Sequence, residues 1–165
     1  MRIAFDLSRV IIRGEVKHTP NFIANGNVYL PDAAPTLLSI VARHGADQIF
    51  IFSCVKDDRE EQTVRHWFVR HSFSLHTGIL LENIHLCRRR SQKRDFCKQF
   101  HPDVIVDDRF EVLHHVAEDV PNLFLFQGRE EEIQKKRNEP FRDLLHNRVT
   151  RVESWPELGA SLLAA

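Results

Sequence analysis

The sequence predicts an α/β protein built on a doubly wound, Rossmann-like parallel sheet. Three observations predict this class. Short runs of β-branched and aromatic residues recur along the chain, and each run is apolar throughout, as in strands that helices cover on both faces. Segments with helical character separate the runs. Strands and helices that alternate in this way favour right-handed crossovers between parallel strands.

Four apolar runs bounded by polar turn residues are the expected strands of the sheet. They are residues 2–5, 48–52, 103–106 and 122–126. A further run at residues 149–152 has the character of an edge strand, and a short terminal helix is expected to follow it.

Helices are expected between these runs, at residues 31–44, 57–71, 91–100 and 110–117. The first has Leu37, Leu38 and Val41 at helical spacing and stops at Gly45, a residue that commonly ends helices. The second begins with acidic residues, which stabilise a helix N-terminus. From residue 127 to residue 147 the chain is dense in charge, and Pro140 should break any long helix there. We expect a solvated helix and loop in that segment, and the pattern assigns no role to residues 129–142.

Length and composition fit a single domain spanning residues 1–165. A chain of 165 residues can bury a sizeable core, and 42% hydrophobic with 28% charged residues is typical of a water-soluble globular protein. The 23 basic and 23 acidic residues cancel, so no whole-molecule field attracts nucleic acid or an anionic membrane. The three cysteines form no close pair in the sequence, no stretch approaches the ~20 apolar residues of a membrane span, and a cytoplasmic location is expected.

Polar residues with matching chemistry follow three of the expected strands. Asp6 follows the first, Ser53 the second, and the pair Asp107 and Asp108 the third, while Lys93 lies in the helix before that third strand. Ligands of open α/β sheets bind at the carboxyl ends of the strands, so these side chains should converge. Carboxylates suit Mg²⁺, the cation and the lysine neutralise a phosphate, and one carboxylate remains free to attack phosphorus.

These residues resemble the four motifs of the haloacid-dehalogenase-like (HAD) superfamily, in the same order, over roughly residues 1–126. The matching segments are IAFDLS, IFIFSC, RRRSQKRDFC and VIVDDRFEVL. The resemblance implies a HAD-like fold and a Mg²⁺-dependent phosphohydrolase or phosphotransferase acting on a phosphomonoester. It implies that Asp6 is the nucleophile that forms an aspartyl-phosphate. Ser53 would bind the phosphoryl group, Lys93 would stabilise charge, and Asp107 with Asp108 would join Asp6 in holding the metal.

One position departs from the family pattern. Phosphatases of the superfamily usually carry a second Asp two residues after the nucleophile as general acid and base, and here that residue is Ser8. A hydroxyl is a far weaker acid than a carboxyl group, and this role is commonly worth ~10²- to 10⁴-fold. Slow hydrolysis is therefore expected. The family's metal contact from this position uses a backbone carbonyl, which Ser8 retains. The alternative function is a catalytically weak phosphate-binding or regulatory protein.

The resemblance also bears on the entrance to the site. Residues 9–30 are long enough only for a small cap or flap, and no large insertion follows Ser53. In the family, this arrangement resembles members that act on bulky substrates. A phosphorylated substrate is expected, although its identity does not follow from the sequence, and neither does the oligomeric state.

Other classes fit less well. A basic cluster at residues 88–94 could contact nucleic acid, but zero net charge and the absence of an aromatic ladder do not favour it. The histidines lack the spacing of a zinc site, and Cys54 is not followed by the Cys-x5-Arg loop of cysteine phosphatases. A two-component receiver domain uses similar residues in a different order.

Overall fold

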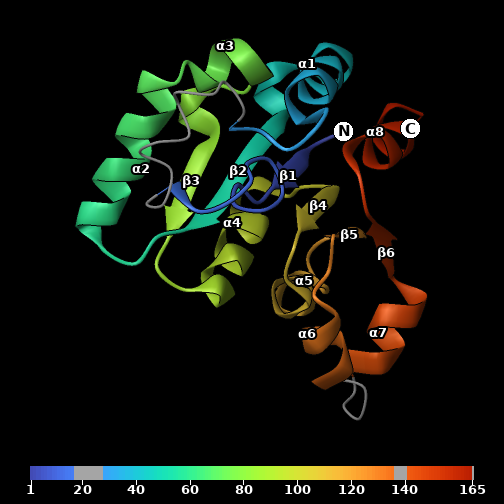
Figure 1. The fold of residues 1–165 in the computed structure, drawn as a ribbon. Helices are drawn as coiled ribbons and strands as arrows, with labels where there is room; N and C mark the ends of the chain where they lie inside the picture. Colours follow the sequence, from blue (N-terminus) through green and yellow to red (C-terminus); the bar gives the residue numbers. More distant parts are fainter. Residues whose placement is uncertain (17–27, 136–140, 165) are drawn as a thin grey trace.

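The computed structural model describes residues 1–16, 28–135 and 141–164, and it contains one six-stranded sheet (Figure 1). The strand order is β3-β2-β1-β4-β5-β6, and every neighbouring pair is parallel. The strands are β1 (Ile3–Phe5), β2 (Ile49–Cys54), β3 (Ile84–Cys87), β4 (Val104–Asp107), β5 (Asn122–Phe126) and β6 (Val149–Val152).

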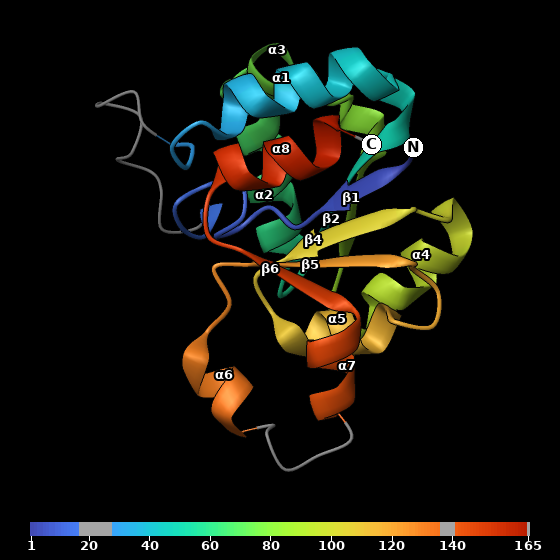
Figure 2. The same ribbon diagram turned by 90° about the vertical axis from the view of Figure 1, so that its right-hand side faces the viewer.

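Helices cover both faces of this sheet (Figure 2), as expected for a doubly wound fold. One face carries α1 (Ala33–His44), α2 (Asp58–Arg70), α3 (Phe73–Thr77) and α8 (Trp155–Leu163). The other carries α4 (Lys93–Phe100), α5 (Phe110–Val116), α6 (Glu130–Lys135) and α7 (Phe141–Asn147). Short 3₁₀ turns occupy Ala46–Gln48, Leu81–Asn83 and Arg90–Gln92.

Two hydrophobic cores explain why the central strands have continuous apolar runs. In β1, Ile3 and Phe5 pack into the core beneath α1 and α8, whereas Ala4 packs into the core on the side of α4 and α5. In β2, Phe50 and Phe52 likewise belong to the second core. Since successive side chains point to opposite faces, a strand covered on both sides has no solvent-facing position to leave polar.

The edge strand β3 and the short helix α3 are not among the elements that the sequence predicts. β3 has the sequence Ile-His-Leu-Cys, and His85 interrupts its apolar pattern. The ring of His85 stacks on Phe100 of α4 with centroids 4.2 Å apart, so a polar residue fills a packed position here. Only tertiary contact distinguishes such a short strand from a loop.

The C-terminal part of the chain confirms the expected edge strand β6 and the helix α8. The expectation of one solvated helix and loop in the charged segment is wrong, because the segment holds two helices, α6 and α7. Ile133 of α6 is buried in the second core, and Leu144 and Leu145 of α7 pack against it. Pro140 lies outside the described residues.

The chain after β1 returns on itself beside the sheet. The backbone N–H groups of Ile11 and Ile12 both donate to the carbonyl of Leu7. Leu30 N–H donates to the Ile11 carbonyl at 2.8 Å, which joins the two described ends of the expected flap. Residues 17–27 of that flap lie outside the described residues. No described helix combines the length and apolar character that crossing a membrane requires.

Candidate functional site

The carboxyl ends of β1, β2 and β4 meet at one edge of the sheet and form the site. Phe5 of β1 is in register with Ile51 of β2 and Val106 of β4, so the residues that follow them lie side by side. Asp6 N–H donates to the Val106 carbonyl at 2.9 Å, which continues the ladder one residue beyond β1. Asp6 and Asp107 are thereby placed across from each other.

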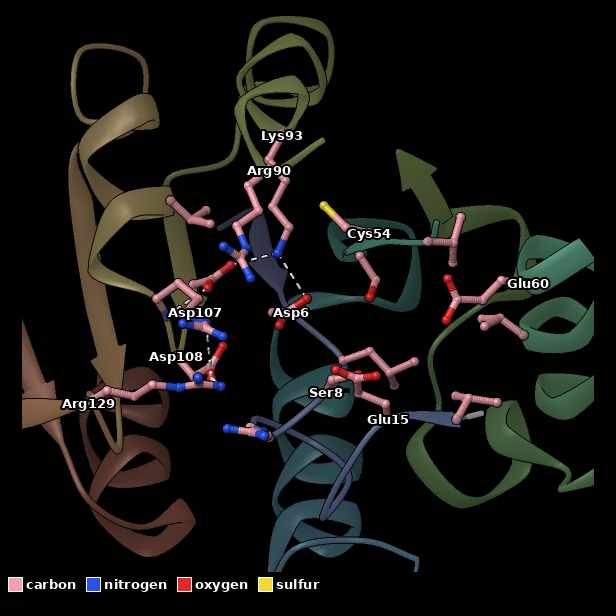
Figure 3. A pocket seen from close by; sticks show the side chains of 18 residues that line it. Asp6, Ser8, Glu15, Cys54, Glu60, Arg90, Lys93, Asp107, Asp108 and Arg129 are labelled. Atoms are coloured by element: carbon pink, nitrogen blue, oxygen red, sulfur yellow. Dashed lines mark hydrogen bonds and ion pairs between the residues drawn. The ribbon is translucent and has the colours of Figure 1, made fainter. Parts of the chain in front are cut away.

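Lys93 lies between these two carboxylates at the start of α4 (Figure 3). Its Nζ donates to Asp6 Oδ1 at 2.9 Å and to Asp107 Oδ2 at 2.7 Å, and its side chain is only 3% exposed. The 3₁₀ turn before it is fixed by Gln92, whose side-chain oxygen accepts from the N–H groups of Arg88 and Arg89. This local turn starts α4 where its first residue reaches the sheet edge.

Three carboxylates cluster at this site, and two of them contact Lys93. Together they carry more negative charge than the single positive charge of the lysine can balance. Asp6, Asp107 and Asp108 each offer an oxygen, and these oxygens lie within 4.8 Å of one another. Burial raises the pKa of Asp107 above its usual range, and Asp6 and Asp108 raise it further against the effect of Lys93. Burial also raises the pKa of Asp108. Buried negative charge of this density favours a bound cation.

The charge of Lys93 is held in place by the same carboxylates. Burial alone would lower the pKa of its ammonium group, but the charges of Asp107 and Asp6 outweigh that effect and raise the pKa above its ordinary value. Lys93 is therefore a permanent buried cation at neutral pH.

Mg²⁺ fits the donor set of the site. It prefers hard oxygen ligands and usually binds through a few carboxylates together with phosphate oxygens and water. The oxygens of Asp6 and Asp107 that accept hydrogen bonds retain a second lone pair for a metal. The third carboxylate is oriented by two arginines. Asp108 Oδ2 lies 3.5 Å from Arg129 Nη2 and 4.0 Å from Arg109 Nε.

The structure brings all the sequence-predicted site residues to one pocket. Its walls include Asp6, Ser8, Ser53, Lys93, Asp107 and Asp108. Ser53 is 5% exposed at the end of β2, whereas Ser8 is half-buried in the turn after β1. A pocket that holds carboxylates, a lysine and a hydroxyl can accept a phosphate group together with a cation.

Arg129 and Glu15 are among the charged pocket residues that sequence reasoning missed. Arg129 precedes α6 and reaches Asp108 from the charged segment. Glu15 lies in the loop after β1 and also lines the pocket. Neither stands in a motif, and each resembles an ordinary surface charge until the fold positions it.

The basic cluster before α4 is partly neutralised within the chain. Arg88 pairs with Asp58 and Glu61, and Arg94 pairs with Glu118 and Asp119. These ion pairs occupy positive charges that would otherwise bind the phosphates of a nucleic acid.

Comparisons with solved structures agree with this topology. Over 99% of both chains, the protein is similar to D,D-heptose 1.7-bisphosphate phosphatase from B. bronchiseptica complexed with magnesium and phosphate, with a TM-score of 0.68 and 14% identity. Over 100% of this chain and 94% of the other, it is similar to a de novo designed Rossmann 3x3 fold protein, with a TM-score of 0.50 and 13% identity. The fold is Rossmann-like and HAD-like.

Within the described residues this HAD-like fold carries no large cap. The HAD domain of the effector protein Lem4 from Legionella pneumophila matches with a TM-score of 0.48 and 10% identity, over 98% of this chain and 93% of that one. No family model and no curated protein matches the sequence.

Proposed function

We propose that the protein is a Mg²⁺-dependent phosphohydrolase or phosphotransferase that acts on a phosphomonoester through an aspartyl-phosphate at Asp6. The observation that carries the proposal is the buried ammonium of Lys93, 2.9 Å from Asp6 and 2.7 Å from Asp107, with Asp108 completing a set of three carboxylates. The similarity to a phosphatase complexed with magnesium and phosphate supports the same chemistry.

Each residue has a distinct role in this proposal. Asp6, Asp107, Asp108 and the Ser8 backbone carbonyl would hold Mg²⁺, which would supply positive charge to neutralise the phosphate. A carboxylate oxygen of Asp6 attacks phosphorus and forms the covalent bond, while the bond to the leaving oxygen breaks. The Ser53 hydroxyl and the Lys93 ammonium bind the phosphoryl oxygens.

The proton for the leaving oxygen is the step that this chain supports least well. Ser8 stands where a carboxyl group would supply it, and a hydroxyl does so poorly. Glu15 also lines the pocket, from a different point in the chain. We infer that substrates with good leaving groups react fastest.

The mouth of the pocket suggests an anionic substrate. Four arginines line it in addition to Lys93, namely Arg9, Arg90, Arg109 and Arg129. A second anionic group on the substrate would be stabilised by these cations. Bisphosphates therefore belong in any substrate panel beside simple phosphomonoesters.

The experiment that tests the function is a phosphatase assay over such a panel, with Mg²⁺ or with EDTA. Asp6→Asn should abolish activity that the wild type shows with Mg²⁺, because an amide cannot form the aspartyl-phosphate. Asp95→Asn, an exposed residue of the same helix as Lys93, is the control and should retain activity. Full activity in the Asp6→Asn variant would refute the covalent mechanism.

A second candidate function is phosphate binding or regulation without efficient turnover, and Ser8 favours it. Ser8→Asp restores a carboxyl group at the acid/base position and should raise hydrolysis, with ~10²- to 10⁴-fold as the range for such a group. Ser8→Asn introduces a side chain of the same shape as Asp but without an ionisable proton, so it should not raise the rate of hydrolysis. Equal, negligible rates in both variants would favour the binding function over the enzyme.

A further inference from the structure

Two cysteines that are 33 residues apart in sequence meet in the wall of the pocket. Cys54 ends β2, Cys87 ends β3, and the two are register partners in the parallel ladder. Their Sγ atoms lie 2.9 Å apart in a thiol–thiol hydrogen bond. The function proposed above uses neither residue.

The two thiols differ in access and in acidity. Cys54 is half-buried and lines the pocket with Asp6 and Lys93, whereas Cys87 is buried. The hydrogen bond from Cys87 lowers the pKa of Cys54 against the opposing effect of burial, and Lys93 lowers it further. The same hydrogen bond and burial raise the pKa of Cys87. Cys54 is thus the reactive partner, and the more deeply buried Cys87 lies beside it.

We propose that Cys54 and Cys87 form an oxidation site at which a small hydroperoxide entering the pocket converts the two thiols to a disulfide. The Cys54 thiolate attacks the peroxide O–O bond and becomes a sulfenic acid, and the departing oxygen takes a proton to leave as water or an alcohol. Cys87 sulfur then attacks Cys54 sulfur and displaces hydroxide, which leaves as water with the Cys87 proton. The two thiols lose two electrons, and the peroxide gains them.

The typical spacing of neighbouring strands suits a disulfide between register partners. Neighbouring strands lie about 4.8 Å apart, inside the range of about 4.4–6.8 Å that disulfides span between Cα atoms. The sulfur atoms need only approach from 2.9 Å to about 2.05 Å. Because Cys87 Sγ also contacts the Ser53 carbonyl at 3.5 Å, the bond would lock the strand end that carries Ser53 to its neighbour.

The test treats the folded wild-type protein with hydrogen peroxide, blocks free thiols with an alkylating agent, and analyses unreduced peptides by mass spectrometry. The expected product joins the Cys54 and Cys87 peptides with a mass lower by two hydrogen atoms, and dithiothreitol reverses it. Cys97, which is buried in the second core, should be recovered as a free thiol. Its Cys97→Ser variant is the matched control and should form the same cross-link.

Cys87→Ala should leave Cys54 as a sulfenic or sulfinic acid, with no cross-linked peptide. Recovery of both wild-type thiols in reduced form, oxidation of Cys54 beyond sulfenic acid while Cys87 stays free, or a cross-link that appears only in denaturant would each overturn the proposal. The readout is a mass, so it separates this inference from the phosphatase assay.

Discussion

Lys93 determines the electrostatics of the site at the scale of a single residue. Among the described lysines, Lys93 is the only one whose ammonium contacts the buried carboxylates. It pairs with both Asp6 and Asp107. Removing one partner of a buried ion pair leaves the other charges without compensation, which costs far more than losing an exposed pair.

Lys93→Met should therefore lower the free energy of unfolding of the metal-free protein by about 3–5 kcal/mol. Added Mg²⁺ should restore part of this loss, because a bound cation replaces the missing charge. Urea unfolding with Mg²⁺ and with EDTA measures both effects. Lys98→Met changes an exposed lysine of the same helix and should shift stability little. Similar losses in the two variants would contradict this account of Lys93.

The sequence predicted that the main site residues would meet in one pocket, because each stands at the end of a buried strand or in a matching motif. Asp6, Ser53 and Asp107 are placed by strand ends, and a parallel sheet brings strand ends together without further information. Glu15 and Arg129 could not be predicted in this way. Their positions depend on the path of a loop and of the charged segment, which no local pattern specifies.

At the scale of elements, α8 anchors the turn that carries Ser8. The indole Nε1 of Trp155, buried at the start of α8, donates to the Val10 carbonyl at 2.7 Å. Its ring also packs on Phe5 of β1 with centroids 5.6 Å apart. The C-terminal helix thus supports both the strand and the turn that flank Asp6.

Trp155→Phe keeps a large aromatic ring but leaves the buried Val10 carbonyl unsatisfied, so it should cost about 1–3 kcal/mol from that group alone. Trp67→Phe is the matched control. The Nε1 of Trp67 is buried with no partner among the described residues, so its replacement removes no hydrogen bond. Denaturant unfolding should show the larger loss for Trp155→Phe, and a larger loss for Trp67→Phe would refute this anchoring role.

The elements that the sequence missed share a physical cause. His85 interrupts the apolar run of β3, and α3 has only five residues, so neither shows a clear pattern in the sequence. Their structure comes from tertiary contact, in β3 through pairing with β2 and in α3 through packing of Phe73 in the first core. Strands such as β1 and β4, which are no longer than β3, were predictable because burial on both faces gives a continuous apolar run.

At the scale of the whole molecule, the strand order explains why the site lies where it does. The order β3-β2-β1-β4-β5-β6 reverses between β1 and β4, and a crevice forms at the carboxyl ends where such an order reverses. Asp6 follows β1, and Asp107 and Asp108 lie at the end of β4, so the carboxylates flank this switch point.

Binding of Mg²⁺ at this switch point should stabilise the entire fold, because the unfolded chain does not bring the three carboxylates together. At a Mg²⁺ concentration of 100 times its dissociation constant the gain should be about 2.7 kcal/mol. Thermal unfolding at several Mg²⁺ concentrations measures it. Asp107→Asn and Asp108→Asn should each reduce the Mg²⁺-dependent shift, whereas Asp95→Asn should preserve it. An unchanged shift in both site variants would place the metal elsewhere.

The most direct test of the central proposal is to look for phosphate on Asp6 itself. Acetyl phosphate has a good leaving group and needs little help from a general acid, so it should phosphorylate the protein in the presence of Mg²⁺ even with Ser8 in place. Because Ser8 also slows attack by water, the aspartyl-phosphate should persist long enough for mass spectrometry after an acid quench. The account predicts one added phosphoryl group on the peptide that contains Asp6. This group should not form when EDTA is present during the reaction or in the Asp6→Asn variant. Phosphate on another residue, or none in a protein that hydrolyses the compound, would contradict it.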